Sequence, residues 1–139
     1  LGSRGIGFSR ANRFGKELNY QIKKFKPIIV AMIETKSAVE NLDKILKLDG
    51  LDAIFIGPYD LSASYKVTGK FKSKKFQNIL KQIKKVADKN KIACGMHVVR
   101  PNKDELKSLI KKKFKFLAYS MDSVIIQNYY QYPLKWKKK

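Results

Sequence analysis

Residues 28–34 read IIVAMIE, and residues 53–62 read AIFIGPYDLS. Each segment begins with an uninterrupted apolar run and then changes to polar or turn-forming residues. Apolar runs of this length are typical of strands that are buried on both faces, as in parallel sheets. A helical pattern lies between the two runs. We therefore predict that residues 28–33 and 53–56 form neighbouring parallel strands of an α/β fold.

An acidic side chain follows each of these two predicted strands. Glu34 comes directly after the first strand, and Asp60 comes shortly after the second. Because α/β barrels place their chemistry at the carboxyl ends of the strands, the two carboxylates are expected to converge. Hard oxygen ligands on a rigid scaffold suit Mg²⁺ or Mn²⁺ that carries a substrate. The pair is a candidate metal site, and the alternative is two surface acids at strand ends.

Strands and helices alternate along the rest of the chain. Further strands are predicted at residues 92–98 and 116–119, and helices at residues 37–47, 60–65, 74–91 and 103–113. Asn102 is the expected N-cap of the last of these helices. The alternation favours parallel strands joined by right-handed crossovers. Four strands are half of those in a complete α/β barrel, so residues 1–139 are predicted to form a single partial domain, with a basic tail at residues 135–139.

Five stretches of the chain resemble one protein family. They are GSRGIGFSRANRFG (2–15), AMIETKSAVENLDKIL (31–46), LDGLDAIFIGPYDLSAS (48–64), IACGMHVVRPN (92–102) and FKFLAYSMDSVII (114–126). In their residues and in their order along the chain, these stretches are similar to the HpcH/HpaI aldolase/citrate lyase family, the class II pyruvate aldolases. The resemblance implies a (β/α)8 TIM barrel of the phosphoenolpyruvate/pyruvate type. This chain would be its C-terminal half, with about four βα units.

The resemblance also implies an activity and the residues that carry it. The enzyme would be a metal-dependent carbon–carbon lyase that cleaves or forms a 4-hydroxy-2-keto acid from pyruvate and an aldehyde. Glu34 and Asp60 would be the ligands of Mg²⁺ or Mn²⁺, or of Co²⁺, and the cation would stabilise the pyruvate enolate. Main-chain N–H groups near Tyr59 and Asp60 would hold the pyruvate carboxylate, with Gly57 and Pro58 in the same loop. A Schiff-base lysine is not needed, and the first three predicted strands contain no lysine.

Three further side chains are candidates for contact with the substrate. Arg4 and Arg10 lie in the glycine-rich opening segment, where a substrate-side role and a purely structural loop are both open. His97 is the single histidine and lies near the end of a predicted strand. A pocket-lining role for His97 is favoured over proton transfer or metal ligation. Asp122, after the last strand, is expected to be a structural cap.

The length of the chain limits this interpretation. A complete barrel of this class needs about 250 residues, whereas the chain has 139. The general-base histidine and the substrate-binding arginine of the family lie on first-half strands, so no position here receives either role. We expect a fragment that is inactive alone, from a full-length enzyme that is a homo-oligomer. An acyl-CoA lyase of the citrate-lyase type, with the same metal and enolate chemistry, is the alternative enzyme.

The formal charge of +20 and the pI near 10.1 suggest an anionic partner. However, only four of the 31 basic residues are arginines, so 27 are lysines. Nucleic-acid readers usually depend on arginine and interleaved aromatic residues. The lysines here fall on the predicted solvent faces of amphipathic helices. We therefore interpret the positive charge as a means of keeping the protein soluble, and we expect no specific nucleic-acid partner. The alternative is a non-enzymatic basic binding module.

Cys94 lies within an apolar run and has no second cysteine to pair with, so it is expected to be a buried small hydrophobe. The sequence contains no apolar stretch of membrane-spanning length and no signal-peptide pattern. A cytoplasmic enzyme without a membrane partner is the default expectation. The sequence leaves open the aldehyde, the direction of the reaction and the choice of metal.

Overall fold

The computed structural model describes residues 7–17, 19–20 and 26–135. One parallel sheet of four strands, in the order β1-β2-β3-β4, organises this part of the chain. The strands are β1 (Val30–Ile33), β2 (Ala53–Ile56), β3 (Ala93–Val98) and β4 (Phe116–Tyr119). The predicted parallel α/β arrangement is confirmed, and the sheet order follows the chain order.

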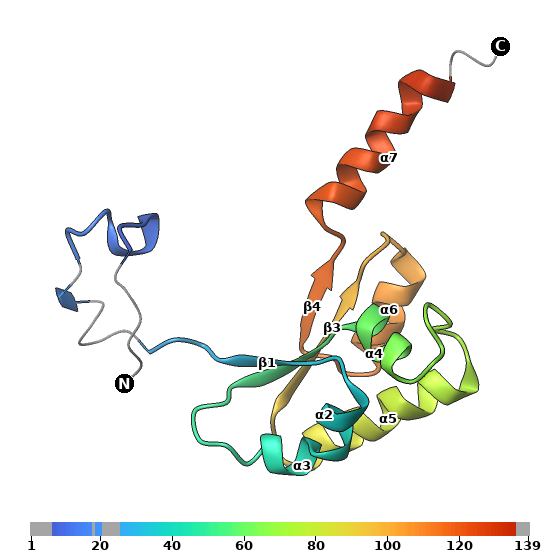
Figure 1. Cartoon of the computed structure of the whole chain (residues 1–139), viewed down its shortest axis with the longest axis horizontal. Helices are drawn as coiled ribbons and strands as arrows, with labels where there is room; N and C mark the ends of the chain where they lie inside the picture. The colour runs from blue at the N-terminus through green and yellow to red at the C-terminus, as the bar shows by residue number, and fades with distance from the viewer. Residues whose placement is uncertain (1–6, 18, 21–25, 136–139) are drawn as a thin grey trace.

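Helices occupy the connections between the strands. They are η1 (Arg10–Asn12, a 3-10 helix), α2 (Lys36–Glu40), α3 (Leu42–Ile45), α4 (Pro58–Ser64), α5 (Lys74–Lys89), α6 (Lys103–Lys111) and α7 (Asp122–Lys135). In Figure 1, α2, α3, α5 and α6 lie on one side of the sheet, whereas α7 projects away from it. None of the helices within the described ranges has the length and apolarity that a membrane span requires.

The hydrophobic core lies between the sheet and the helices on this one side. Alternate strand residues point into the core, and it includes Ile33, Ile54, Ile56, Cys94, Met96 and Val98. Their partners on α5 include Phe76 and Ile83, both with no exposed surface. Residues of the opposite parity point to the other face, where Met32 is 56% exposed and Phe116 is 49% exposed. Within the described residues, helices therefore cover one face of the sheet and leave the other open.

Helix α5 shows how local sequence sets an element of the core. The Ser73 hydroxyl accepts a hydrogen bond from the Phe76 N–H (3.3 Å) and caps the start of the helix. Apolar residues at helical spacing form the buried stripe, and lysines occupy the remaining positions. The helix ends at Lys89, two residues before the predicted end, because Lys91 adopts a left-handed conformation with φ of +58°. Helix α6 likewise ends at Lys111, and Lys113 has φ of +62°.

The single helix predicted over residues 37–47 is wrong, because the structure has two short helices, α2 and α3, in its place. They are separated at Asn41, whose side-chain N–H donates to the Ser37 carbonyl (3.0 Å). Asparagine side chains of this kind compete with main-chain helical bonds. Val39, Leu42 and Leu46 in this segment are all buried.

Other boundaries differ by one or two residues. Strand β1 begins at Val30 instead of residue 28, because the Ile29 N–H bonds the Asp52 carboxylate (2.7 Å) and Ile28 is 81% exposed. Strand β3 begins at residue 93 instead of 92. Helix α4 spans residues 58–64 instead of 60–65. These shifts leave the strand ends in place.

The sequence did not predict α7. It begins at Asp122, whose carboxylate accepts the Ser123 N–H (2.7 Å), close to the capping role expected for this residue. Several of its apolar side chains are exposed, among them Ile126 at 64% and Tyr129 at 74%. Of the predicted basic tail, Lys135 ends this helix and residues 136–139 lie outside the described residues.

Gly95 generates a prediction about the open face of the sheet. A methyl group there would lie 2.5 Å from the Phe116 carbonyl oxygen and 2.8 Å from Phe55 Cδ2. We expect Gly95→Ala to lower the free energy of unfolding by about 1–3 kcal/mol through overpacking. Gly7→Ala is the control, since no atom lies within 4 Å of a methyl group there, and it should change stability by less than about 0.5 kcal/mol. Urea denaturation followed by circular dichroism measures both, and equal midpoints would contradict the prediction.

Cys94 generates a second prediction. The side chain is 2% exposed, as expected from its apolar context. Burial raises its pKa to about 12, because the thiolate is poorly solvated there. We expect the folded chain at about pH 8 to react with an aromatic disulfide reagent far more slowly than the unfolded chain in urea. Equal reaction rates with and without urea would contradict the assignment of Cys94 as buried.

The raised pKa of Cys94 also stabilises the folded state below pH 9.0, and this contribution to stability is lost as the pH rises towards 12.

Candidate metal and substrate site

The carboxyl ends of β1 and β2 lie next to each other. Ile33 pairs with Ile56 in the parallel register, and the Gly57 N–H donates to the Ile33 carbonyl (3.3 Å). The next residue of each strand is therefore at the same edge. Glu34 is half-buried there, and its Oε2 lies 3.5 Å from the position that a Cβ on Gly57 would take. The structure thus brings Glu34 directly over the residue that precedes α4.

Asp60 belongs to the first turn of α4. Gly57 is the N-cap and Pro58 occupies the first helical position, which suits proline because that N–H has no intrahelical acceptor. The Leu61 N–H closes the turn on the Gly57 carbonyl (3.0 Å). Asp60 is exposed and lies where the helix dipole favours an anionic side chain. Both predicted carboxylates are therefore placed at one edge of the sheet, on adjacent strand-to-helix connections.

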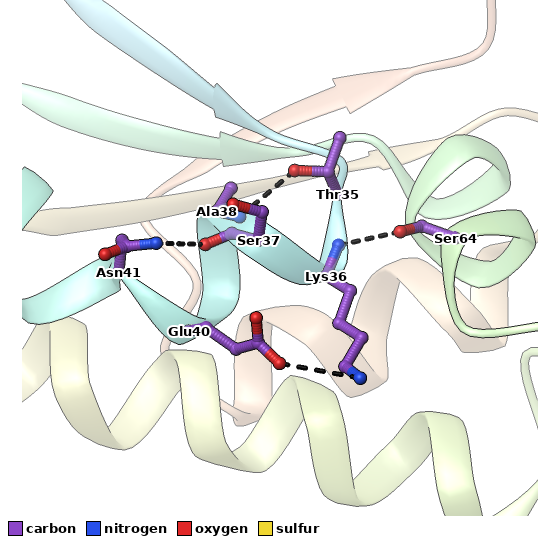
Figure 2. A network of polar contacts seen from close by, with 7 residues as sticks. All are labelled: Thr35, Lys36, Ser37, Ala38, Glu40, Asn41 and Ser64. Atoms are coloured by element: carbon purple, nitrogen blue, oxygen red, sulfur yellow. Dashed lines mark hydrogen bonds and ion pairs between the residues drawn. The ribbon is translucent and has the colours of Figure 1, made fainter.

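Hydrogen bonds fix the loop after β1 against α4 (Figure 2). The Lys36 N–H donates to Ser64 Oγ (2.7 Å), and Thr35 Oγ1 accepts from the Ala38 N–H (3.1 Å) to cap α2. Lys36 also pairs with Glu40 on the exposed side of α2 (3.6 Å). The segment that carries Glu34 is thus held between its own helix and the last turn of α4.

The interior of α4 is fixed by Ser62, which has no exposed surface. Its hydroxyl donates to the Tyr59 carbonyl (2.7 Å) and accepts from the Gly69 N–H (3.0 Å). The Tyr59 ring packs edge-on against Phe71, with centroids 4.9 Å apart. The Tyr59 ring therefore packs against Phe71. The group of Tyr59 that can donate a hydrogen bond at the carboxyl edge of the sheet is its main-chain N–H. First-turn N–H groups lack intrahelical acceptors.

His97 lies on the open face of β3, as its neighbours Met96 and Val98 are buried beneath the helices. Its Nε2 is 3.0 Å from the Ser120 carbonyl oxygen, and its ring centroid is 6.3 Å from that of Phe55. We did not identify Ser120 from the sequence. Its position directly after the last predicted strand could have indicated that it lies at this edge. His97 and Ser120 lie at the ends of β3 and β4, on the same edge of the sheet as Glu34.

Of the two arginine candidates, the structure describes only Arg10. Arg4 lies outside the described residues. Arg10 is exposed in η1, which lies beyond the starting end of β1 in Figure 1. The substrate-side roles of both residues stay predictions.

Two hollows lie away from the Glu34 and Asp60 carboxylates. One of about 450 Å³ lies between α5 and α6, with Leu80, Leu109 and Phe114 among its lining residues. A second, of about 700 Å³, adjoins it and includes Phe71 and Met96. Neither of these two hollows includes Glu34, Asp60 or His97 in its lining.

The donors suit a magnesium-like ion. Across the described ranges, no group of three or more histidine, cysteine, aspartate or glutamate side chains is placed to hold a metal. Glu34 and Asp60 would therefore supply two carboxylates at most. This matches Mg²⁺, which is usually bound by one or two carboxylates and completes its octahedron with water and substrate oxygens. Structural zinc sites, with four protein ligands, do not fit these donors.

The fold is a parallel α/β domain with candidate donors at the carboxyl edge of its sheet, and the comparisons with known proteins give the family. The model of the HpcH/HpaI aldolase/citrate lyase family matches residues 8–128. The chain belongs to this family. It is 34% identical over 131 residues to a hydroxypyruvate/pyruvate aldolase of Roseobacter denitrificans, covering 91% of this chain and 50% of that protein.

A second relative and a solved structure are also similar to this chain. A 2-keto-3-deoxy-L-rhamnonate aldolase of Shigella dysenteriae is 34% identical over 128 residues, covering 89% of this chain and 47% of that protein. The crystal structure of an HpcH/HpaI aldolase from Desulfitobacterium hafniense superposes with a TM-score of 0.79 at 24% identity, over 100% of this chain and 54% of that one. The chain therefore spans about half the length of these relatives and has the fold of the C-terminal half of their barrel.

Proposed function

We propose that this chain is the second half of a metal-dependent pyruvate aldolase. The supporting observation is the placement of Glu34 over Gly57, with Asp60 in the following helical turn, at the carboxyl edge of a parallel sheet. Relatives named as aldolases of pyruvate and of a 2-keto-3-deoxy sugar acid support the same reaction class. The substrates would be pyruvate and an aldehyde, or the 4-hydroxy-2-keto acid that they form.

Each residue at the edge has a distinct task in this proposal. Glu34 and Asp60 hold a divalent cation, Mg²⁺, Mn²⁺ or Co²⁺. When bound, the cation supplies charge stabilisation for the enolate oxygen of pyruvate. The main-chain N–H groups of Tyr59 and Asp60 donate to the pyruvate carboxylate, which the positive end of α4 favours. Gly57 and Pro58 set the path of the chain between the two carboxylates.

The reaction also needs a general base and a cationic group that binds the substrate. We propose that the other half of the barrel provides them, and that the complete enzyme is a cytoplasmic homo-oligomer. The open face of the sheet would then become the interior of the barrel. Met32 and Phe55, both on that face, would help to exclude water from the reacting groups.

The metal assignment gives a testable prediction. Glu34→Gln and Asp60→Asn each remove an anionic ligand from a site with two, so Mn²⁺ affinity should fall at least about tenfold in each variant. Asp104→Asn is the matched control, because Asp104 also lies in the first turn of a helix that follows a strand, and its affinity should equal the wild-type value. Electron paramagnetic resonance of free Mn²⁺ during titration measures all four proteins. Unchanged affinity in both site variants would refute the metal assignment.

Reconstitution tests the aldolase activity itself. The chain would be co-expressed with the first half of the Roseobacter denitrificans relative, since this chain matches 50% of that protein. We expect the pair to release pyruvate from a 4-hydroxy-2-keto acid, with activity lost on chelation of metal or with Glu34→Gln. The chain alone should be inactive.

Two other results would contradict the proposal. Pyruvate release by the chain alone would show that the first half is not needed. Cleavage of a 3-hydroxyacyl-CoA thioester by the reconstituted pair, without action on the hydroxy-keto acid, would favour an acyl-CoA lyase of the citrate-lyase type.

A further inference from the structure

The side chain of His97 has a defined orientation on the open face. In the register of β3 and β4, His97 pairs with Ala118, and the flanking core residues Met96 and Val98 are buried on the opposite face. The imidazole is half-buried and lies beside Phe55. It is therefore on the side of the sheet that contains Glu34, and at the same carboxyl edge.

Its hydrogen bond determines which nitrogen carries the proton. Nε2 is 3.0 Å from the Ser120 carbonyl oxygen. A carbonyl oxygen can only accept, so Nε2 must be the donor. In a neutral imidazole the other nitrogen, Nδ1, is then an acceptor with a free lone pair. Nδ1 has no hydrogen-bond partner among the residues that the structure describes.

Ser120 gives an independent sign that this edge is built to hold a ligand. Its main chain has φ of +65°, a left-handed conformation that is unusual for serine, and its N–H donates to the Val98 carbonyl (2.7 Å). Its Oγ is buried and has no partner in the described part of the chain. Buried hydroxyl groups in folded proteins normally have a partner. Two polar atoms, Nδ1 of His97 and Oγ of Ser120, thus have no hydrogen-bond partner among the described residues. They lie at the adjacent carboxyl ends of β3 and β4.

We propose that His97 is a specificity-determining residue that accepts, at Nδ1, a hydrogen bond from a substrate hydroxyl. The ligand class is a hydroxylated aldehyde or the hydroxy-keto acid made from it. The Ser120 carbonyl fixes the tautomer and the ring, and the Ser120 hydroxyl is a second group for the same ligand. This inference rests on the proposed aldolase function, since it names the substrate that the same site selects.

The tautomer can be measured independently of activity, because His97 is the only histidine in the chain. A long-range ¹⁵N–¹H spectrum of the labelled chain at about pH 8.5 should show a protonated Nε2 and an unprotonated Nδ1. The opposite tautomer, or a mixture in rapid exchange, would overturn the proposal.

Selectivity is then tested in the reconstituted enzyme with glycolaldehyde and acetaldehyde, which differ by one hydroxyl. His97→Gln can still donate towards Ser120 but has no acceptor at the place of Nδ1. It should lower the ratio of kcat/KM for glycolaldehyde to kcat/KM for acetaldehyde by up to roughly tenfold, because only glycolaldehyde has the hydroxyl that Nδ1 accepts. His97→Asn, whose amide oxygen can take the place of Nδ1, should retain more of the preference. An unchanged ratio in His97→Gln would overturn the role of His97.

If the reconstituted enzyme acts on neither aldehyde, the aldolase proposal fails and binding decides the role of His97. The labelled chain would be titrated with 3-hydroxybutyrate and, separately, with butyrate. A shift of the Nδ1 resonance with the hydroxylated acid alone would support the proposal, and no shift with either acid would refute it.

Discussion

The parallel register between β1 and β2 is the constraint on which the site depends. It pairs Ile33 with Ile56, so the residues that follow each strand emerge at one edge, and Glu34 comes to lie over Gly57. Side chains alternate between faces along a strand, so a slip of one residue would move Ile54 and Ile56 from the core to the open face. The burial of these two isoleucines therefore also fixes the position of the carboxylate.

The sheet has two unequal faces, and this asymmetry explains much of the chain. Helices bury one face in a continuous hydrophobic core, whereas Met32 and Phe116 on the other face are about half exposed. Gly95 lets the rings of Phe55 and Phe116 approach each other to 5.4 Å on that open face. Such packing is consistent with the interior of a barrel, where side chains from neighbouring strands fill the space. The half-length match to the aldolase relatives has the same explanation.

Several lysines of the described residues lie on α3 and α5, outside the proposed site. Lys47 pairs with Asp43 on α3, and Lys84 pairs with Asp88 on α5, both with a spacing of four residues. Hydrogen bonds from Lys47 and Asn90 hold the pKa of the Asp43 carboxyl below its usual value, and the Asn90 bond also links α3 to the end of α5. The Lys47–Asp43 pair is exposed, so it contributes little stability because water and salt screen it. In the second pair the side chain of Lys84 is 15% exposed and that of Asp88 is 62% exposed.

The sequence by itself determined the order of the four strands, the presence of helical segments between them and the positions of the two carboxylates after strand ends. These features follow from the local period of apolar residues and from the change to polar residues, which are visible without knowledge of distant contacts. The break at Asn41 and the left-handed ends of α5 and α6 depend on individual hydrogen bonds and backbone angles that the period does not encode. The hydrogen bond between His97 and Ser120 was decided by the tertiary structure alone. It joins residues 23 positions apart, and only the register of β3 against β4 brings that carbonyl within reach of the imidazole.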